Sequence, residues 1–128
     1  EIMSSDWSSD VCSSDLWRTP GTIENRLRMM HALNLPRDLL DAPFAQLSGG
    51  EKQRAVIVQT LQVPRRIRVL DEPTSALDAD NRRRAVDLLA ADAGTACLAV
   101  SHDTEWREAA DRVFVLADGR LVEEGGDA

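Results

Sequence analysis

Lysine is almost absent from this 128-residue chain, in which Lys52 is the only one. A glycine-rich loop that wraps nucleotide phosphates reads Gly-x-x-x-x-Gly-Lys followed by Ser or Thr. Gln53 follows Lys52, and the required glycine spacing does not precede it. The chain therefore contains no phosphate-wrapping loop of this kind.

Cysteine and long apolar runs are also scarce. Cys12 and Cys97 are too few for a disulfide framework and too far apart for a metal motif. No apolar run approaches the roughly 18 residues that cross a bilayer, and the N-terminus has no basic patch followed by an apolar stretch. These features favour the cytoplasm or the cytoplasmic face of a membrane.

Positive charge is limited as well. The chain has 15 Lys and Arg against 22 Asp and Glu, a formal net charge of -7, which argues against a groove that binds nucleic acid. The single basic run, at residues 82–84, has acidic neighbours on both sides. We interpret it as a solvated helix face.

The first 16 residues differ from the rest of the chain. Ser-Ser-Asp occurs three times there without apolar periodicity, a composition typical of disorder. The string at 10–16, Asp-Val-Cys-Ser-Ser-Asp-Leu, is also what the end of a common synthetic sequencing adapter encodes. We expect residues 1–16 to be a non-native, adapter-derived tail or a disordered natural one, fused to a partial domain at 17–128.

From residue 17 onward, helical and strand patterns alternate. Apolar spacing predicts helices over 22–33, 48–62, 79–92 and 103–110, with a short turn at 37–40. Ser48 and Glu51 have the spacing of a capping box. Apolar runs predict strands at 67–71 and 95–100, the second one buried, and a hairpin joins 112–116 to 120–124. This order predicts an α/β fold, a mainly parallel sheet with flanking helices, preceded by a helical subdomain.

Polar side chains follow both predicted parallel strands. Asp71 and Glu72 end the first, at the rim where α/β proteins bind ligands, and His102 ends the second. Asp71 suits Mg²⁺, and Glu72 is placed to orient or deprotonate an attacking water. Alone, Asp71-Glu72 before a proline would be an acidic surface turn. Because His102 can face the same point and contact a terminal phosphate, a phosphate-binding catalytic site is favoured over a surface turn.

Ser48-Gly49-Gly50 begins a predicted helix. Two glycines there expose consecutive backbone N–H groups at the positive end of the helix dipole, which suits an anion such as a γ-phosphate. The alternative is a helix cap and nothing more, and three residues alone are weak support for either. The eight-residue string at 47–54, Leu-Ser-Gly-Gly-Glu-Lys-Gln-Arg, is far more specific.

That string resembles the signature motif of ATP-binding cassette (ABC) ATPases. Residues 69–73 resemble their Walker B motif, 75–78 their D-loop and 101–103 their switch-histidine loop. The resemblance covers about residues 18–124. It implies a P-loop NTPase-type fold truncated at its N-terminus, with 18–62 as the helical subdomain and signature helix and 63–128 as the C-terminal part of the RecA-like core.

The resemblance implies ATP and Mg²⁺ as cofactors and a head-to-tail dimer with a second ABC ATPase subunit, identical or different, that drives a transmembrane permease. It makes Asp71 the Mg²⁺ ligand, Glu72 the catalytic base and His102 the contact to the γ-phosphate. The chain alone, lacking the phosphate loop, is expected to be inactive. The residues expected at the partner's nucleotide or the dimer seam are Ser48, Gly49, Gly50, Gln53 and Asp78.

The same strings are most similar to small ATPases paired with metal (iron) export permeases. We therefore expect a peripheral protein at the cytoplasmic face of the inner (plasma) membrane, without a nucleic-acid partner. The alternative is a non-transport ABC ATPase of ribosomes or DNA repair. The ribosome-associated branch usually has Asn-His in place of Ser75-Ala76, and the DNA-repair branch needs insertions that residues 22–124 do not contain.

Arg68 departs from the family pattern, because it lies inside the Walker B strand among apolar residues. A buried Arg without a partner would be costly. We expect either a strand shifted to the edge, with Arg68 reaching solvent, or a sequence error nearby.

Overall fold

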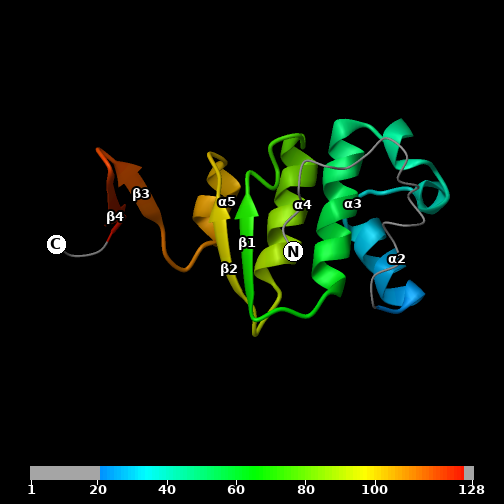
Figure 1. Cartoon of the computed structure of the whole chain (residues 1–128), viewed down its shortest axis with the longest axis horizontal. Helices are drawn as coiled ribbons and strands as arrows, with labels where there is room; N and C mark the ends of the chain where they lie inside the picture. Colours follow the sequence, from blue (N-terminus) through cyan, green and yellow to red (C-terminus); the bar gives the residue numbers. More distant parts are fainter. Residues whose placement is uncertain (1–20, 126–128) are drawn as a thin grey trace.

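The computed structural model describes residues 21–125, in which helices and short strands alternate in the predicted order. The predicted tail at 1–16 lies outside the described residues. Predicted and observed ends agree within about two residues, the usual uncertainty of such boundaries; α4, for example, ends at Ala90 rather than at residue 92. The elements, shown in Figure 1, are α2 (Ile23–Ala32), η1 (Arg37–Leu40), η2 (Phe44–Gln46), α3 (Gly49–Gln62), β1 (Ile67–Asp71), α4 (Ala79–Ala90), β2 (Ala96–Val100), α5 (Thr104–Ala109), β3 (Phe114–Ala117) and β4 (Arg120–Glu123).

Side-chain caps set the starts of α2 and α3. Thr22 accepts a hydrogen bond from the backbone N–H of Asn25, and α2 begins at the next residue. Ser48 and Glu51 form the predicted capping box, in which Ser48 Oγ accepts from the Glu51 N–H and the Glu51 carboxylate accepts from the Ser48 N–H. Because the backbone N–H of Ser48 favours the ionised carboxylate, the pKa of Glu51 lies below its ordinary value.

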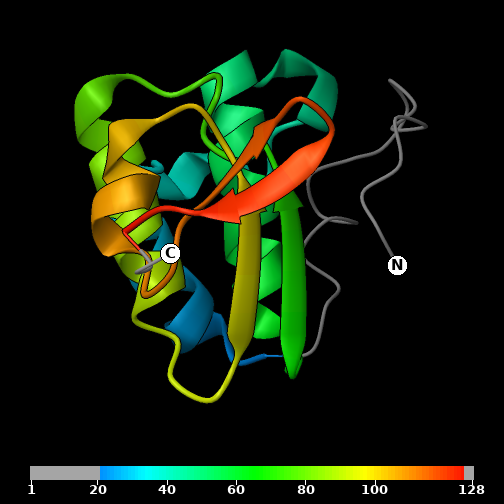
Figure 2. The same cartoon turned by 90° about the vertical axis from the view of Figure 1, so that its left-hand side faces the viewer.

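The strands form two separate pairs. β1 and β2 are parallel, with Ile67 opposite Ala96 and Asp71 opposite Val100, so their carboxyl ends meet at one edge. β3 and β4 form an antiparallel hairpin. Its turn residues Asp118 and Gly119 have φ values of 49° and 74°, the combination that a type I′ turn requires. Figure 2 shows this hairpin in front of the parallel pair, on the side away from α2.

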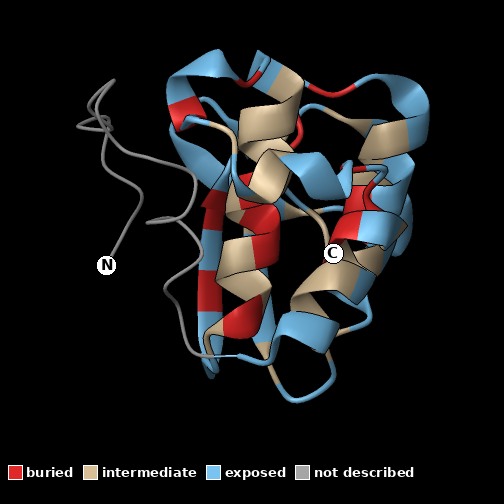
Figure 3. Cartoon of the chain, turned by 90° about the vertical axis from the view of Figure 1, so that its right-hand side faces the viewer, coloured by how far each residue is buried: buried red, intermediate tan, exposed pale blue. Residues whose placement is uncertain are grey.

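Helices α2, α3 and α4 lie on one side of the parallel pair (Figure 1). Side chains of β1 alternate in burial, and its second and fourth residues face the helices. Figure 3 shows buried positions interspersed with half-buried ones along α3. No helix within residues 21–125 is long and apolar enough to span a bilayer. The core cluster consists of Met30, Leu33, Leu35, Phe44, Leu47, Ala55, Ile57, Val58, Leu70, Leu77, Ala85 and Leu89.

The opposite face of the parallel pair is open, and this corrects one prediction. The strand predicted at 95–100 was expected to be buried, whereas within β2 only Ala99 is partly buried. Two strands covered by helices on one side leave every second side chain in solvent. The large apolar residues exposed in this way are Ile67 and Val69 at 67% each, Leu98 at 58% and Val100 at 56%.

Arg68 corrects a second prediction. Its side chain is only 4% exposed rather than reaching solvent, and β1 keeps its register there, with Arg68 opposite Cys97. The guanidinium forms an ion pair with Asp92, which follows α4, and Nη2 donates to the Val63 carbonyl oxygen at 3.5 Å. Among the described residues, Arg68 Nε has no hydrogen-bond partner. Asp92 therefore supplies the counter-charge that makes a buried Arg tolerable in this strand.

Candidate functional site

The carboxyl ends of β1 and β2 bring Glu72 and His102 together. His102 Nε2 lies 3.4 Å from Glu72 Oε1, with the His102 side chain 95% exposed and that of Glu72 35% exposed. The parallel register places the residues after the two strands side by side, as the sequence predicts. Both groups are open to a ligand at this edge, while their catalytic roles stay predictions.

The backbone of Glu72 has an unusual conformation. Its φ is 45°, in the left-handed region that non-glycine residues rarely adopt. Its N–H donates to the Val100 carbonyl oxygen at 2.8 Å, which continues the pairing of β1 with β2 by one residue. Strained backbone of this kind is often found at functional sites, where the surrounding structure holds it in place.

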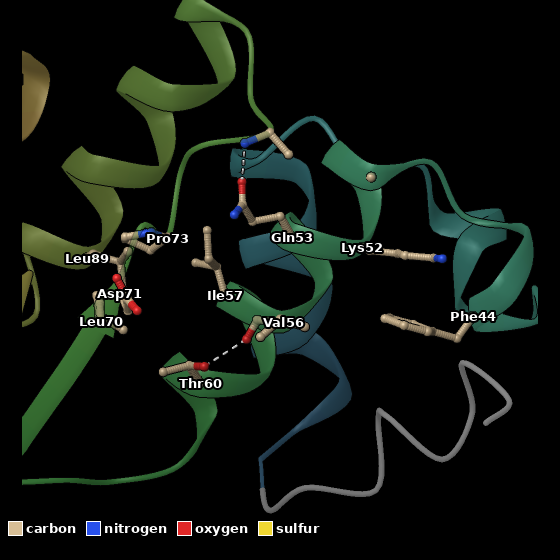
Figure 4. Close-up of a pocket in the computed structure, with 12 residues that line it drawn as sticks. Phe44, Lys52, Gln53, Val56, Ile57, Thr60, Leu70, Asp71, Pro73 and Leu89 are labelled. Atoms are coloured by element: carbon tan, nitrogen blue, oxygen red, sulfur yellow. Dashed lines mark hydrogen bonds between the residues drawn. The ribbon is translucent and has the colours of Figure 1, made fainter. Parts of the chain in front are cut away.

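Asp71 lies one residue earlier, at the end of β1, and is exposed. It lines a mainly apolar hollow of about 410 Å³ between α3 and β1, together with Gln53 and Lys52 (Figure 4). No cluster of three or more metal-ligating side chains occurs within residues 21–125. Because Mg²⁺ commonly takes one or two carboxylates and completes its shell with water and substrate phosphates, Asp71 fits a nucleotide-bound Mg²⁺.

The start of α3 contains Ser48, Gly49 and Gly50, and the surroundings of the two glycines differ. Ser48 and Gly49 are exposed and Gly50 is half-buried, and the first N–H groups of a helix have no acceptor within it. A Cβ added at Gly50 would lie 3.2 Å from the carbonyl oxygen of Ala76, whereas one at Gly49 would meet nothing within 4 Å. Gly50 thus lies in close contact with the loop at 72–77, where a side chain would be crowded, while the surface at 49 is open.

This contrast makes a stability prediction. We expect Gly50→Ala to lower the free energy of unfolding by about 1 kcal/mol, since the new methyl group crowds a backbone carbonyl. We expect Gly49→Ala to be neutral or to stabilise by up to about 1 kcal/mol, because alanine is the better helix former. Urea unfolding of the two single variants checks this. A Gly50→Ala chain as stable as Gly49→Ala would contradict the geometry.

Gln53 binds the loop that follows Glu72. Its Nε2 donates to the Glu72 carbonyl oxygen at 3.1 Å and to Ser75 Oγ at 3.4 Å. Its Oε1 accepts from the Ala76 N–H at 2.9 Å, the dashed line beside Gln53 in Figure 4. A contact of Gln53 with a partner's nucleotide stays a prediction. Within this chain, its carboxamide joins α3 to the loop at 72–77.

Asp78 caps α4. Its Oδ1 accepts from the Asn81 N–H at 2.9 Å and its Oδ2 from Asn81 Nδ2 at 3.1 Å. The backbone bond from Asn81 is the main reason why the pKa of Asp78 lies below its ordinary value. Asp78 is exposed, and its predicted place in a dimer seam stays a prediction.

Sequence reasoning missed a polar network behind the site. Thr74 is fully buried; its Oγ1 donates to Asp103 Oδ2 at 2.7 Å and accepts from Trp106 Nε1 at 3.0 Å. Arg82 Nε lies 3.4 Å from the same Asp103 oxygen. This network joins the loop after Glu72 to the residue after His102. One signal was present, because a tryptophan in a short polar helix needs an acceptor for its indole N–H.

A family model described as ABC transporter matches residues 9–75, more than half of the chain. The chain belongs to the ABC transporter family. The ABC relative EcfA1, an energy-coupling factor transporter ATP-binding protein of Lactobacillus delbrueckii subsp. bulgaricus, is 37% identical over 91 residues, which are 69% of this chain and 32% of the relative. The glutamate transport ATP-binding protein GluA of Corynebacterium glutamicum is 43% identical over 83 residues, 62% of this chain and 34% of the relative. The chain thus spans about a third of these curated relatives.

Solved ABC structures share the fold. The dimeric structure of MJ0796, a bacterial ABC transporter cassette, has a TM-score of 0.74 and 25% identity, covering 91% of this chain and 57% of that one. A post-hydrolysis dimer of the same cassette bound to ADP and Pi has a TM-score of 0.69 and 28% identity, covering 88% and 53%. The predicted α/β fold of the P-loop NTPase type is confirmed, and this chain is part of an ABC cassette.

Proposed function

We propose that this chain is the part of an ABC transporter ATP-binding subunit that carries the hydrolytic carboxylate and the signature helix. One observation carries the proposal: in a member of this family, Glu72 and His102 lie 3.4 Å apart where two parallel strands end. The intact subunit would bind and hydrolyse ATP at a head-to-tail dimer interface and drive transport through a membrane permease. It would work at the cytoplasmic face of the inner membrane.

The geometry suits a water attack on the γ-phosphate. Glu72 would orient the attacking water and accept its proton, while His102, which is exposed beside it, would donate a hydrogen bond to a γ-phosphate oxygen. Asp71 would hold the Mg²⁺ of the nucleotide, and that ion would supply neutralisation of the phosphate charge. Glu72 would act from a backbone that its N–H bond to the Val100 carbonyl oxygen holds in place.

The start of α3 would serve a second nucleotide, held by a partner subunit. Support comes from the exposed Ser48 and Gly49 at that helix start and from the open space around Gly49. A helix start with free donors attracts a phosphate. Asp78, exposed at the start of α4, would lie in the seam between the two subunits.

A chimera tests the proposal. Residues 21–125 would replace the matching part of the MJ0796 cassette, and the rest of that cassette, which binds ADP and Pi, would complete the domain. We expect the chimera to hydrolyse MgATP with a kcat in the ordinary enzyme range, roughly 1 to 10³ per second. The matched control is the 128-residue chain by itself, with no turnover expected. A folded chimera that does not hydrolyse MgATP, or a lone chain as active as the chimera, would sink the proposal.

The cargo is a separate proposal. The strings at 48–54 and 71–78 resemble those of ATPases paired with metal (iron) export permeases, and on that resemblance we propose a metal ion as the transported substrate. Glutamate is the alternative cargo, because the glutamate transport relative GluA is 43% identical over 83 residues. Metal efflux from vesicles that contain the subunit and its permease tests the cargo; efflux unaffected by MgATP would reject it.

A further inference from the structure

We propose that Gln53 is a positioning residue for Glu72: its carboxamide clamps the loop at 72–77 and so fixes the direction in which the Glu72 side chain leaves the backbone. The importance of that direction rests on the proposed function. The clamp itself needs no nucleotide and can be tested without one. In this role, Gln53 acts through Glu72 and does not touch the reacting atoms.

Gln53 both donates and accepts hydrogen bonds, and these bonds reach the two ends of the loop. Its Nε2 donates to the Glu72 carbonyl oxygen at 3.1 Å, at the near end of the loop. Its Oε1 accepts from the Ala76 N–H at 2.9 Å, at the far end. An amide group can donate and accept at once, and no carboxylate or hydrocarbon of the same shape can do both. The loop also lies against Gly50, one turn earlier on the same helix face.

Glu72 needs support because its φ of 45° is unfavourable for a side chain with a Cβ. The peptide before it is held by the bond from its own N–H to the Val100 carbonyl oxygen. The peptide after it is held by Gln53, with a weaker bond from the Ser75 N–H at 3.4 Å. With both peptide planes fixed, the Cα–Cβ direction of Glu72 is fixed too.

The position of Gln53 gives the clamp a further consequence. Gly49 and Gln53 are four residues apart on α3 and therefore share one helix face. A phosphate bound at the helix start would contact the helix that carries the clamp. The proposed partner's nucleotide and this chain's own Glu72 would then be connected through a single rigid turn of α3.

Amide hydrogen exchange of the nucleotide-free 128-residue chain, followed by NMR, tests the clamp. Gln53→Met keeps the length of the side chain and removes both hydrogen bonds, so we expect the Ala76 amide to exchange about tenfold faster. Gln53→Glu keeps an acceptor for the Ala76 N–H and loses the donor to Glu72. We therefore expect Ala76 protection to be retained in that variant, while the ¹³C carboxyl resonance of Glu72 shifts in both. Gln59→Met, the same substitution further along α3, is the control and should change neither signal.

The outcomes are distinct. A side chain that only packs would make Gln53→Met the milder variant, and unchanged Ala76 exchange in it would overturn the proposal. If Gln53→Met unfolds the chain, Gln53→Glu decides: retained Ala76 protection with a shifted Glu72 signal supports the clamp, and any other result rejects it. In the MJ0796 chimera, Gln53→Met should lower kcat at least tenfold and change KM for MgATP by less than about twofold. A chimera without activity would reject the proposed function and leave the exchange result standing.

Discussion

Replacing Glu72 with Gln in the MJ0796 chimera is expected to lower kcat for MgATP hydrolysis by about 10²–10⁴-fold, the usual contribution of a general base. Gln has the size of Glu and can still hydrogen-bond a water, but it cannot accept the proton. Glu72 is the carboxylate next to His102 in the described residues, at 3.4 Å, and it is open to a ligand. We expect nucleotide binding to change by less than about twofold, because Glu72 acts on the water rather than on the phosphate loop.

Glu108→Gln is the matched control for that experiment. Glu108 is an exposed carboxylate on α5 that pairs with Arg83, and it lies in no part of the proposed site. Its substitution should leave kcat unchanged. Steady-state phosphate release gives kcat and KM, and equilibrium binding of a fluorescent nucleotide gives affinity. A Glu72→Gln chimera that keeps more than about a tenth of the activity would remove Glu72 from the role of base.

The largest expected effect on stability comes from Asp92→Ala. Arg68 is buried inside β1, and Asp92 is its counter-charge. Removing one partner of a buried pair leaves a charge without compensation, which costs about 3–5 kcal/mol in fully buried cases. Because Asp92 itself is 34% exposed, water can reach the gap. We expect a loss of about 2–3 kcal/mol in the free energy of unfolding, measured by urea denaturation of the chain.

The double variant Arg68→Met with Asp92→Ala tests whether the loss comes from the unpaired charge of Arg68. Met covers much of the space of the Arg side chain without its charge, so the double variant should recover most of the loss, to within about 1 kcal/mol of the parent. Asp87→Ala is the control, since it removes an exposed carboxylate from α4 whose ion pair with Arg83 is at 3.9 Å, and it should have little effect. Equal losses in Asp92→Ala and in the double variant would mean that Asp92 acts by something other than pairing with Arg68.

Local features of the fold could be predicted because neighbouring residues determine them. Ser48 and Glu51 cap a helix through bonds three residues apart, and the turn at Asp118–Gly119 follows from the residues that tolerate positive φ. The meeting of Glu72 and His102 was predictable too, because it needs only that two strands run parallel. The ABC motifs then assigned this edge to a family.

Features that depend on distant partners could not be predicted. The burial of Arg68 depends on Asp92, which is 24 residues away, and neither residue shows this in its local sequence. The exposure of β2 depends on which elements cover a sheet face, and a run of apolar residues does not carry that information. The contacts of Gln53 with the loop at 72–77 are likewise tertiary, so the signature string suggested a nucleotide contact and not a clamp.

The open face of the β1–β2 pair has a consequence for how this chain behaves in solution. Within the described residues, each of these strands has one partner, so each leaves an outer row of backbone donors and acceptors beside exposed apolar side chains. Such a row is a template on which another chain can add a strand. Self-association that grows with protein concentration follows from this surface, and the residues that set the solubility of the chain are then those of the strands that hold Asp71, Glu72 and His102 in place.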